Sequence, residues 1–208
     1  VASAIAIEAV ARAYFTSRRQ IPASLAIAFE AANRAIFEYG EKHPECQGMG
    51  TTCTALAIRE GKAWLAHVGD SRAYLLRKGQ LGRLTEDQTL LAQMIRDGLI
   101  TEGEAKTARG RNILLQALGT GPHAGPSITN EPISLLAGDI LILCTDGLWS
   151  MVDDAAIARL ASQAPPREAC ENLINAALDA GGFDNVSVAV FRFSEPGHDA
   201  PGKGIETQ

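Results

Sequence analysis

The chain alternates between apolar positions at helical spacing and apolar positions at strand spacing. Residues 1–18 read VASAIAIEAVARAYFTSR, with apolar positions three and four residues apart, which predicts a helix. A second helix is predicted from Pro22, a residue suited to a first helical turn, to about Gly40. The same spacing predicts two helices nearer the other end of the chain, over 151–162 and 165–178.

Between these helices, short apolar runs separated by turn residues predict strands. Two hairpins are predicted, turning at Glu60-Gly61 and at Lys78-Gly79, and a helix start is predicted at Thr85. The predicted strands cover 51–58, 62–68, 72–77, 80–84, 113–118, 128–135, 140–144 and 186–193. Because helices and strands run in blocks, the order predicts an α+β fold with antiparallel sheets. It fits a sheet-on-sheet sandwich flanked by helices.

Candidate chemistry begins in the stretch ILILCTDGLWSM, residues 140–151. Its apolar run is typical of a buried strand and ends at Thr145-Asp146-Gly147. A carboxylate directly after an apolar core needs a cation, a metal ion or backbone donors, because desolvating a charge is costly. Gly147 allows the backbone to turn sharply or to approach another segment closely. The alternative is that Asp146 caps the helix predicted from residue 151.

Two more acids occupy similar places in the pattern. Asp184 lies in Gly181-Gly182-Phe183-Asp184-Asn185, immediately before the last predicted strand. Asp70 interrupts two strand-like runs in AWLAHVGDSRAY, residues 63–74. Three isolated carboxylates at strand edges, beside Gly or Asn, suit hard divalent cations with oxygen ligands. The pattern therefore predicts a shared metal site.

Five segments follow one another in an informative order. They are GDSRAY at 69–74, LTEDQTLLAQMIRDGLIT at 84–101, RNILLQALG at 111–119, GDILILCTDGLW at 138–149 and FDNVSVAVF at 183–191. Together they resemble the metal-dependent serine/threonine protein phosphatases, the PPM or PP2C-like family, in its bacterial single-domain form. The resemblance extends from about Ser3 to Phe193, and the combination is far more specific than any one segment.

The resemblance implies an α-β-β-α sandwich of two antiparallel sheets flanked by helix pairs, with metal ions between the sheet edges. It implies a protein serine/threonine phosphatase that hydrolyses phosphoserine and phosphothreonine monoesters by metal-activated water at a binuclear Mn²⁺ or Mg²⁺ site. In these terms Asp146 and Asp184 are metal ligands, and Asp70 serves a third, weaker ion. Asn185 is expected to orient Asp184. Arg72 is expected to meet phosphate or, in preference, to pair with an acid and lock its loop.

Family members also carry acidic motifs before their first helix, and this chain begins at that helix. The sequence is therefore expected to lack the family's N-terminal strands and its first metal-binding motif, which leaves open the activity of residues 1–208 by themselves. Two explanations stay open: a fragment of an ordinary phosphatase, or a catalytically inactive phosphatase-like module with a binding or regulatory role. A two-metal phosphodiesterase or nuclease is a third class, which the acidic balance and the lack of His ligands disfavour. His67 is expected to be a structural residue of its strand.

Composition and charge limit which binding partners and which cellular compartment are expected. The 208 residues suit one domain, here residues 1–193, followed by a Pro/Gly-rich segment, 194–208, that is predicted to be a disordered tail or linker. The net charge of -5 and the absence of a Lys/Arg cluster argue against nucleic acid, and no apolar run could span a membrane. Four scattered cysteines indicate a reducing cytoplasm. The expected partners are phosphorylated proteins, the substrates of a Ser/Thr kinase.

Overall fold

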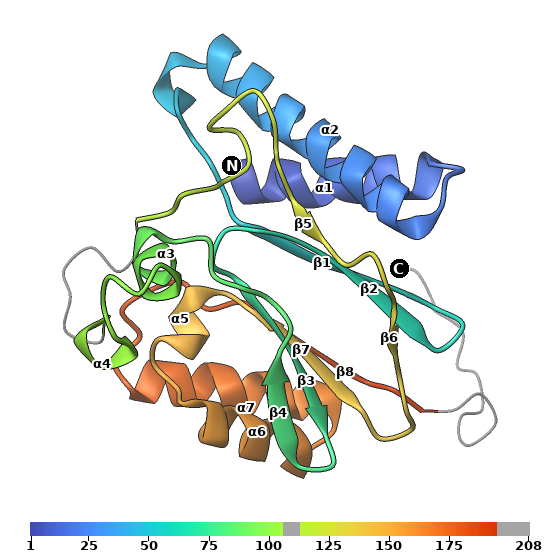
Figure 1. The fold of residues 1–208 in the computed structure, drawn as a ribbon, viewed down its shortest axis with the longest axis vertical. Helices are drawn as coiled ribbons and strands as arrows, with labels where there is room; N and C mark the ends of the chain where they lie inside the picture. The colour runs from blue at the N-terminus through green and yellow to red at the C-terminus, as the bar shows by residue number, and fades with distance from the viewer. Residues whose placement is uncertain (106–112, 195–208) are drawn as a thin grey trace, which may run out of the picture.

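Helices and sheets are stacked in four layers in the computed structural model, which describes residues 1–105 and 113–194 (Figure 1). The outer layers are two helix pairs, α1 (Ala2–Thr16) with α2 (Ile21–Lys42), and α6 (Asp154–Gln163) with α7 (Pro166–Asp179). Two antiparallel sheets lie between them. This arrangement confirms the predicted α-β-β-α sandwich.

The first sheet is centred on β2 (Lys62–Val68). β1 (Cys53–Arg59) pairs with β2 along its whole length, from Cys53 opposite Val68 to Arg59 opposite Lys62. Two short strands, β5 (Ser127–Ile128) and β6 (Ile133–Ser134), pair with β2 on its other side. The tight turn at Glu60-Gly61, with φ of 52° and 69°, closes the hairpin as the sequence predicts.

The second sheet has the order β4-β3-β7-β8. Its strands are β4 (Gln80–Arg83), β3 (Arg72–Arg77), β7 (Ile140–Cys144) and β8 (Val188–Arg192). Alternate residues of β7 point to opposite faces, as a strand requires. Ile140, Ile142 and Cys144 pack toward α6 and α7, whereas Leu141 packs with Ala63 between the two sheets. Burial on both faces explains why the run ILILC contains no polar residue.

Alanines account for the close packing of α1 and α2. Ala2 and Ala6 of α1 and Ala32 of α2 are buried in one core with Phe29 and Ile36. That core joins the helices to the first sheet. A short 3₁₀ turn, η1 (Pro44–Cys46), follows α2, where Pro44 cannot continue the helix.

Some element boundaries differ from the prediction. The helix expected from Thr85 begins instead at Leu90 as α3 (Leu90–Arg96), capped by the Thr89 side chain. The Thr85 hydroxyl accepts a hydrogen bond from Ala73 N at 3.1 Å and is unavailable as a cap. The strand expected over 128–135 is divided into β5 and β6.

Two further predictions near the site were wrong. No strand forms over 113–118, because its two bridges go to different partners, Leu114 to Thr89 and Leu118 to Thr51. The helix expected from Met151 begins at Asp154, after a separate turn of helix, α5 (Asp146–Trp149). The capping start expected at Thr101 is present: its amide and hydroxyl meet Glu104 at 2.8 Å, ahead of α4 (Glu102–Ala105).

Part of the sequence analysis falls outside the described residues. Except for Ser194, the predicted tail over 194–208 lies there, as do residues 106–112 between α4 and the Ile113 segment. Within the part of the chain that the structure describes, no helix has the length and apolar character needed to cross a membrane.

Candidate metal centre

Antiparallel pairing brings the three candidate aspartates to one end of the two sheets. Asp70 lies in the turn between β2 and β3, and Asp146 and Asp184 lie just beyond β7 and just before β8. Arg72, the first residue of β3, is opposite Cys144, and Cys144 is opposite Val188 of β8. The start of β3, the end of β7 and the start of β8 therefore meet at one end of the second sheet, where α5 also lies (Figure 1).

The segments that carry Asp146 and Asp184 are joined by hydrogen bonds of the Thr145 main chain and hydroxyl. Thr145 N donates to Ser187 O at 3.1 Å, and Ser187 N donates back to the Thr145 hydroxyl at 2.9 Å. That hydroxyl also donates to Asn185 O at 3.2 Å. A Cβ added to Gly147 would lie 2.4 Å from Asn185 O, so only glycine permits this approach. The geometry supplies the close approach expected of Gly147.

Both carboxylates of this junction accept short-range backbone hydrogen bonds. Asp146 Oδ1 accepts from Gly147 N at 3.0 Å, and Asp184 Oδ1 accepts from Asn185 N at 2.7 Å. Asn185 thus contacts Asp184 through its main chain. The alternative in which Asp146 caps the following long helix is not what the structure has: Asp153 occupies that position and accepts from Ala156 N at 2.7 Å.

The Asp70 turn is held on several sides. Gly69 N donates to Gln88 Oε1 at 2.7 Å, and Gln88 N donates to Gly69 O at 2.8 Å. Asp70 O accepts from Trp149 Nε1 at 3.0 Å, and the Ser71 hydroxyl meets the Thr52 hydroxyl at 2.7 Å. These contacts fix the backbone of the turn while the Asp70 carboxylate makes no ion pair within the described residues.

Arg72 pairs with an acid, one of the two roles expected for it. Its Nε and one terminal nitrogen bind the two Asp87 oxygens at 2.9 and 2.6 Å. Its other terminal nitrogen donates to the Tyr74 hydroxyl at 3.2 Å, and its guanidinium carbon lies 3.6 Å from the centroid of the Trp149 ring. With its donors engaged in this way, Arg72 braces the turn.

Among the described residues, the three candidate aspartates form no ion pair. Burial and the neighbouring Asp146 and Asp87 carboxylates raise the pKa of Asp70 to about 6. Burial and the Asp184 carboxylate raise the pKa of Asp146. Other buried acids are neutralised: Asp87 by Arg72, and Asp139 by Arg77 at 2.6 Å. The contrast marks the Asp70, Asp146 and Asp184 region as the place where a cation would be favourable.

The donor set fits a hard divalent ion. Within 1–105 and 113–194, no three His, Cys, Asp or Glu side chains converge closely enough to hold an ion by themselves. The aspartates instead influence one another in pairs, Asp70 with Asp146 and Asp146 with Asp184. Mg²⁺ and similar ions are commonly held by one or two carboxylates, with water completing the shell. The residues present therefore fit such ions in an all-oxygen setting.

Neighbouring thiols and His67 have other roles. Burial raises the pKa of the Cys144 thiol to about 12 and that of Cys53 to about 11, so both stay protonated at neutral pH. His67 is buried between the Thr54 hydroxyl, 2.9 Å from Nδ1, and Glu86 O, 3.2 Å from Nε2. Burial lowers its pKa, which fits a neutral residue of the sheet.

Sequence reasoning missed the residues that hold the site together. Trp149 and Thr145 flank Asp146 within the same motif, yet neither gives a periodic or charge signal. Asp87 follows Thr85-Glu86 in a pattern that resembles a helix start, and its pairing with Arg72 spans 15 residues. Trp149 follows Asp146 by three positions, and its contact with Asp70 bridges residues 79 positions apart, which no local pattern indicates.

Fold and site together define a two-sheet sandwich with an acid-lined junction of turns at one sheet end. The sequence model of the family described as Protein phosphatase 2C matches residues 3–91. The serine/threonine protein phosphatase PstP of Mycobacterium tuberculosis is 39% identical over 168 residues, 81% of this chain. Protein phosphatase PhpP of Streptococcus pneumoniae is 34% identical over 167 residues, 80% of this chain.

Solved structures give the same result. The crystal structure of M. tuberculosis PstP/Ppp superposes with a TM-score of 0.86 at 35% identity, covering 93% of this chain and 82% of that one. The PstP catalytic domain in complex with two manganese ions gives 0.80 at 36% identity, covering 91% and 79%. This chain belongs to the protein phosphatase 2C family. It spans 32% of the length of PstP and 67% of that of PhpP.

Proposed function

We propose that this protein is a metal-dependent protein serine/threonine phosphatase, which hydrolyses phosphomonoesters of serine and threonine. The observation that carries the proposal is the gathering of Asp70, Asp146 and Asp184 from three separate turns without an ion-pair partner among the described residues. Membership of the protein phosphatase 2C family and the phosphatase relatives support it.

The proposed cofactors are two Mn²⁺ or Mg²⁺ ions, with a third held more weakly. Support comes from the two manganese ions in the PstP catalytic domain and from the all-oxygen donor set of this chain. Asp146 and Asp184 would hold the pair, and Asp70 would serve the third ion. The chemistry that such ions supply is neutralisation of charge on the phosphoryl oxygens and a lower pKa for water.

The chain's own residues prepare that site in advance. Thr145 and Gly147 join the Asp146 and Asp184 segments, and Arg72 and Gln88 fix the turn that carries Asp70. A site held by hydrogen bonds before the substrate arrives needs little reorganisation during the reaction. Cys53 and Cys144 do not provide a nucleophile, because burial raises the pKa of both thiols far above neutrality.

The proposed partners are phosphorylated proteins that a Ser/Thr kinase produces, and the proposed compartment is the cytoplasm. Phosphoprotein substrates are supported by the names of the relatives, PstP and PhpP among them. A reducing compartment is supported by Cys46, Cys53, Cys144 and Cys170, which are all free thiols.

Turnover assays test the proposal directly. The protein is supplied with Mn²⁺ or Mg²⁺ and given phosphoserine and phosphothreonine peptides, p-nitrophenyl phosphate and bis-p-nitrophenyl phosphate. We expect hydrolysis of the monoesters that chelation abolishes, with the diester spared. Preference for the diester would refute a phosphatase in favour of a phosphodiesterase. Metal binding without turnover of any substrate would instead indicate an inactive binding module.

A further inference from the structure

Trp149 connects two of the three aspartate-bearing turns. It is the last residue of α5, the helical turn that begins at Asp146, so its backbone is rigidly related to that carboxylate. Its indole N–H donates to the main-chain oxygen of Asp70 at 3.0 Å. One side chain thus joins the turn after β7 to the turn between β2 and β3.

Arg72 packs on the face of the Trp149 indole ring. Its guanidinium lies over the Trp149 ring at 3.6 Å and is itself fixed by both Asp87 oxygens. A cation over an indole face is favourable, most of all when it is partly removed from water. The Arg72 and Asp87 side chains are only 15% and 11% exposed, so the support is well shielded.

A tryptophan that only filled the hydrophobic core would not need a hydrogen bond to Asp70. Trp149 does pack against the apolar layer beneath α6 and α7, and its ring contributes there as any large aromatic would. Core packing gives no reason for the N–H to meet the carbonyl of Asp70 in particular. The acceptor of that bond is the main-chain oxygen of Asp70. The Asp70 carboxylate forms no ion pair among the described residues and is repelled by the Asp146 carboxylate.

We propose that Trp149 is a positioning residue that fixes the separation of the Asp70 and Asp146 carboxylates and thereby sets the affinity for the divalent ion near them. The inference rests on the proposed metal-dependent function. Phenylalanine would keep the ring beneath Arg72 and lose the bond to Asp70. Substitution of a residue that orients a metal ligand typically changes the metal affinity by about 10- to 100-fold.

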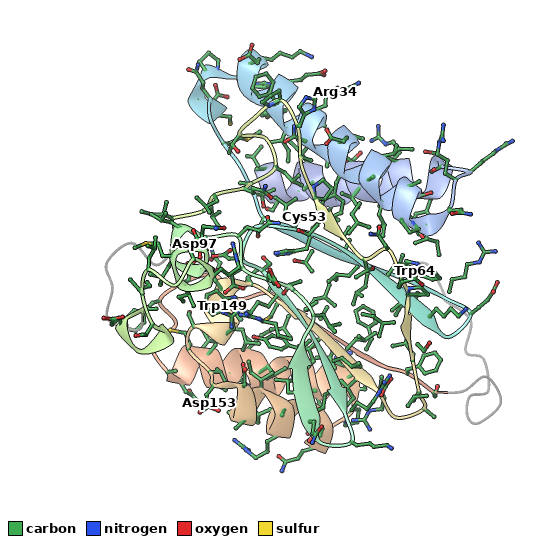
Figure 2. All side chains as sticks on the ribbon, viewed as in Figure 1. Arg34, Cys53, Trp64, Asp97, Trp149 and Asp153 are labelled. Atoms are coloured by element: carbon green, nitrogen blue, oxygen red, sulfur yellow. The ribbon has the colours of Figure 1, made fainter. Side chains whose placement is uncertain are left out.

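A double-mutant cycle on Mn²⁺ affinity tests the inference, with Trp149→Phe, Asp70→Asn and the double variant measured by calorimetry. Trp64→Phe is the matched control: Trp64 lies on β2, well apart from Trp149 (Figure 2), and it packs against the core of α1, α2 and the first sheet instead of the core beneath α6 and α7. We expect Trp149→Phe to weaken Mn²⁺ binding by about tenfold. We expect no further loss when it is added to Asp70→Asn, because coupled residues give non-additive effects.

A second measurement leaves Trp149 in place. The chain has two tryptophans, so Trp64→Phe makes Trp149 the sole indole emitter. Mn²⁺ is paramagnetic and quenches nearby fluorophores, so its titration should quench Trp149 emission, and Asp70→Asn should shift this quenching to higher Mn²⁺ concentration. This readout needs no change at Trp149 and therefore stays valid if Trp149→Phe folds poorly.

The outcomes separate this inference from the proposed function. A non-additive cycle supports the positioning role even in a protein that hydrolyses no phosphopeptide. Equal losses from Trp149→Phe with and without Asp70 would overturn it, even in an active phosphatase. It would also be overturned by wild-type affinity in a folded Trp149→Phe, or by quenching of Trp149 that ignores Asp70→Asn.

Discussion

An aspartate lies at each end of β7, and the fold provides an arginine partner for only one of the two. Asp139 comes immediately before the strand, is buried, and is bound by Arg77 at 2.9 and 2.6 Å and by Leu136 N at 2.7 Å. Asp146 comes just after the strand and has no ion pair within the described chain. The Arg77 hydrogen bonds lower the pKa of Asp139, whereas burial and Asp184 raise that of Asp146.

A base partner within the fold distinguishes a structural acid from a functional one. Both acids adjoin the same apolar run, so the cost of desolvating a carboxylate applies to each. At Asp139 an arginine offsets that cost within the fold. Near Asp146 the fold places other acids instead of a base. The cost of desolvating the Asp146 carboxylate is therefore left to be offset by a bound cation.

The largest expected effect is on turnover, in Asp146→Asn. We expect metal-dependent phosphopeptide hydrolysis to fall at least about a hundredfold, since changes even behind metal ligands reach that size. Without metal, the melting temperature should stay level or rise, because the change removes repulsion between Asp146 and Asp184. Turnover in EDTA-treated and Mn²⁺-reloaded protein, with thermal melts, measures both.

A lower metal-free melting temperature in Asp146→Asn, with turnover retained at saturating Mn²⁺, would contradict a metal-binding role for Asp146. Asp146 would then be a structural acid like Asp139. Asp184→Asn serves as the parallel variant and should behave as Asp146→Asn does.

Gly147→Ala should have the next largest effect, because it separates the two carboxylate-bearing segments. The new Cβ would lie 2.4 Å from Asn185 O, a backbone atom that cannot move alone. We expect a loss of roughly 2–3 kcal/mol in unfolding free energy, typical of overpacking, together with weaker Mn²⁺ binding. Gly82→Ala is the control: its nearest atom would be Leu75 O at 3.8 Å, an ordinary contact. Equal stability of the two variants in urea would show that the junction is not tight.

The sequence predicted the layers well because each layer depends on local periodicity. The helices at 1–18 and around 166–178 and the run Ile140 to Cys144 follow directly from the spacing of apolar residues. The strand expected over 113–118 failed because Ile113, Leu114 and Leu115 are exposed, and because Leu114 and the buried Leu118 bridge different segments. Periodicity describes a segment and does not say what lies beside it.

The candidate site was predictable only in part for the same reason. Asp70, Asp146 and Asp184 stand out as acids at strand edges, but so does Asp139, whose partner Arg77 is 62 residues away. The brace of Arg72, Asp87 and Trp149 likewise depends on contacts between distant segments. Which acid is neutralised and which is left open is a property of tertiary pairing, so the sequence alone could not separate them.

Asp139→Asn should destabilise the fold without changing the site. We expect a loss of about 2 kcal/mol, less than for a fully buried pair because Arg77 is 34% exposed. The pKa of Asp139 is lowered from 3.8, so its contribution is present above pH 3.8 and is lost as pH falls through the folded-state value below that. The stability gap between wild type and variant should therefore be level from pH 5 to 8 and close in stronger acid, as measured by urea unfolding. A gap that widened in acid would contradict the pairing, and altered Mn²⁺ affinity would break the contrast with Asp146.

The smallest expected effect comes from a third acid, Asp153, which tests whether closeness in sequence to Asp146 is enough to matter. Asp153 lies seven positions after Asp146, is exposed, and accepts from Ala156 N at 2.7 Å as the N-cap of α6 (Figure 2). Because an N-cap satisfies one free helix N–H, Asp153→Ala should cost about 1 kcal/mol. Asp153→Ser, which keeps a capping oxygen without the charge, should recover most of that loss. Mn²⁺ affinity should be unchanged in both variants, since the carboxylate serves the helix. Weaker Mn²⁺ binding in Asp153→Ser would mean that the charge of Asp153 contributes to the centre, and that the open acids extend beyond the three turns.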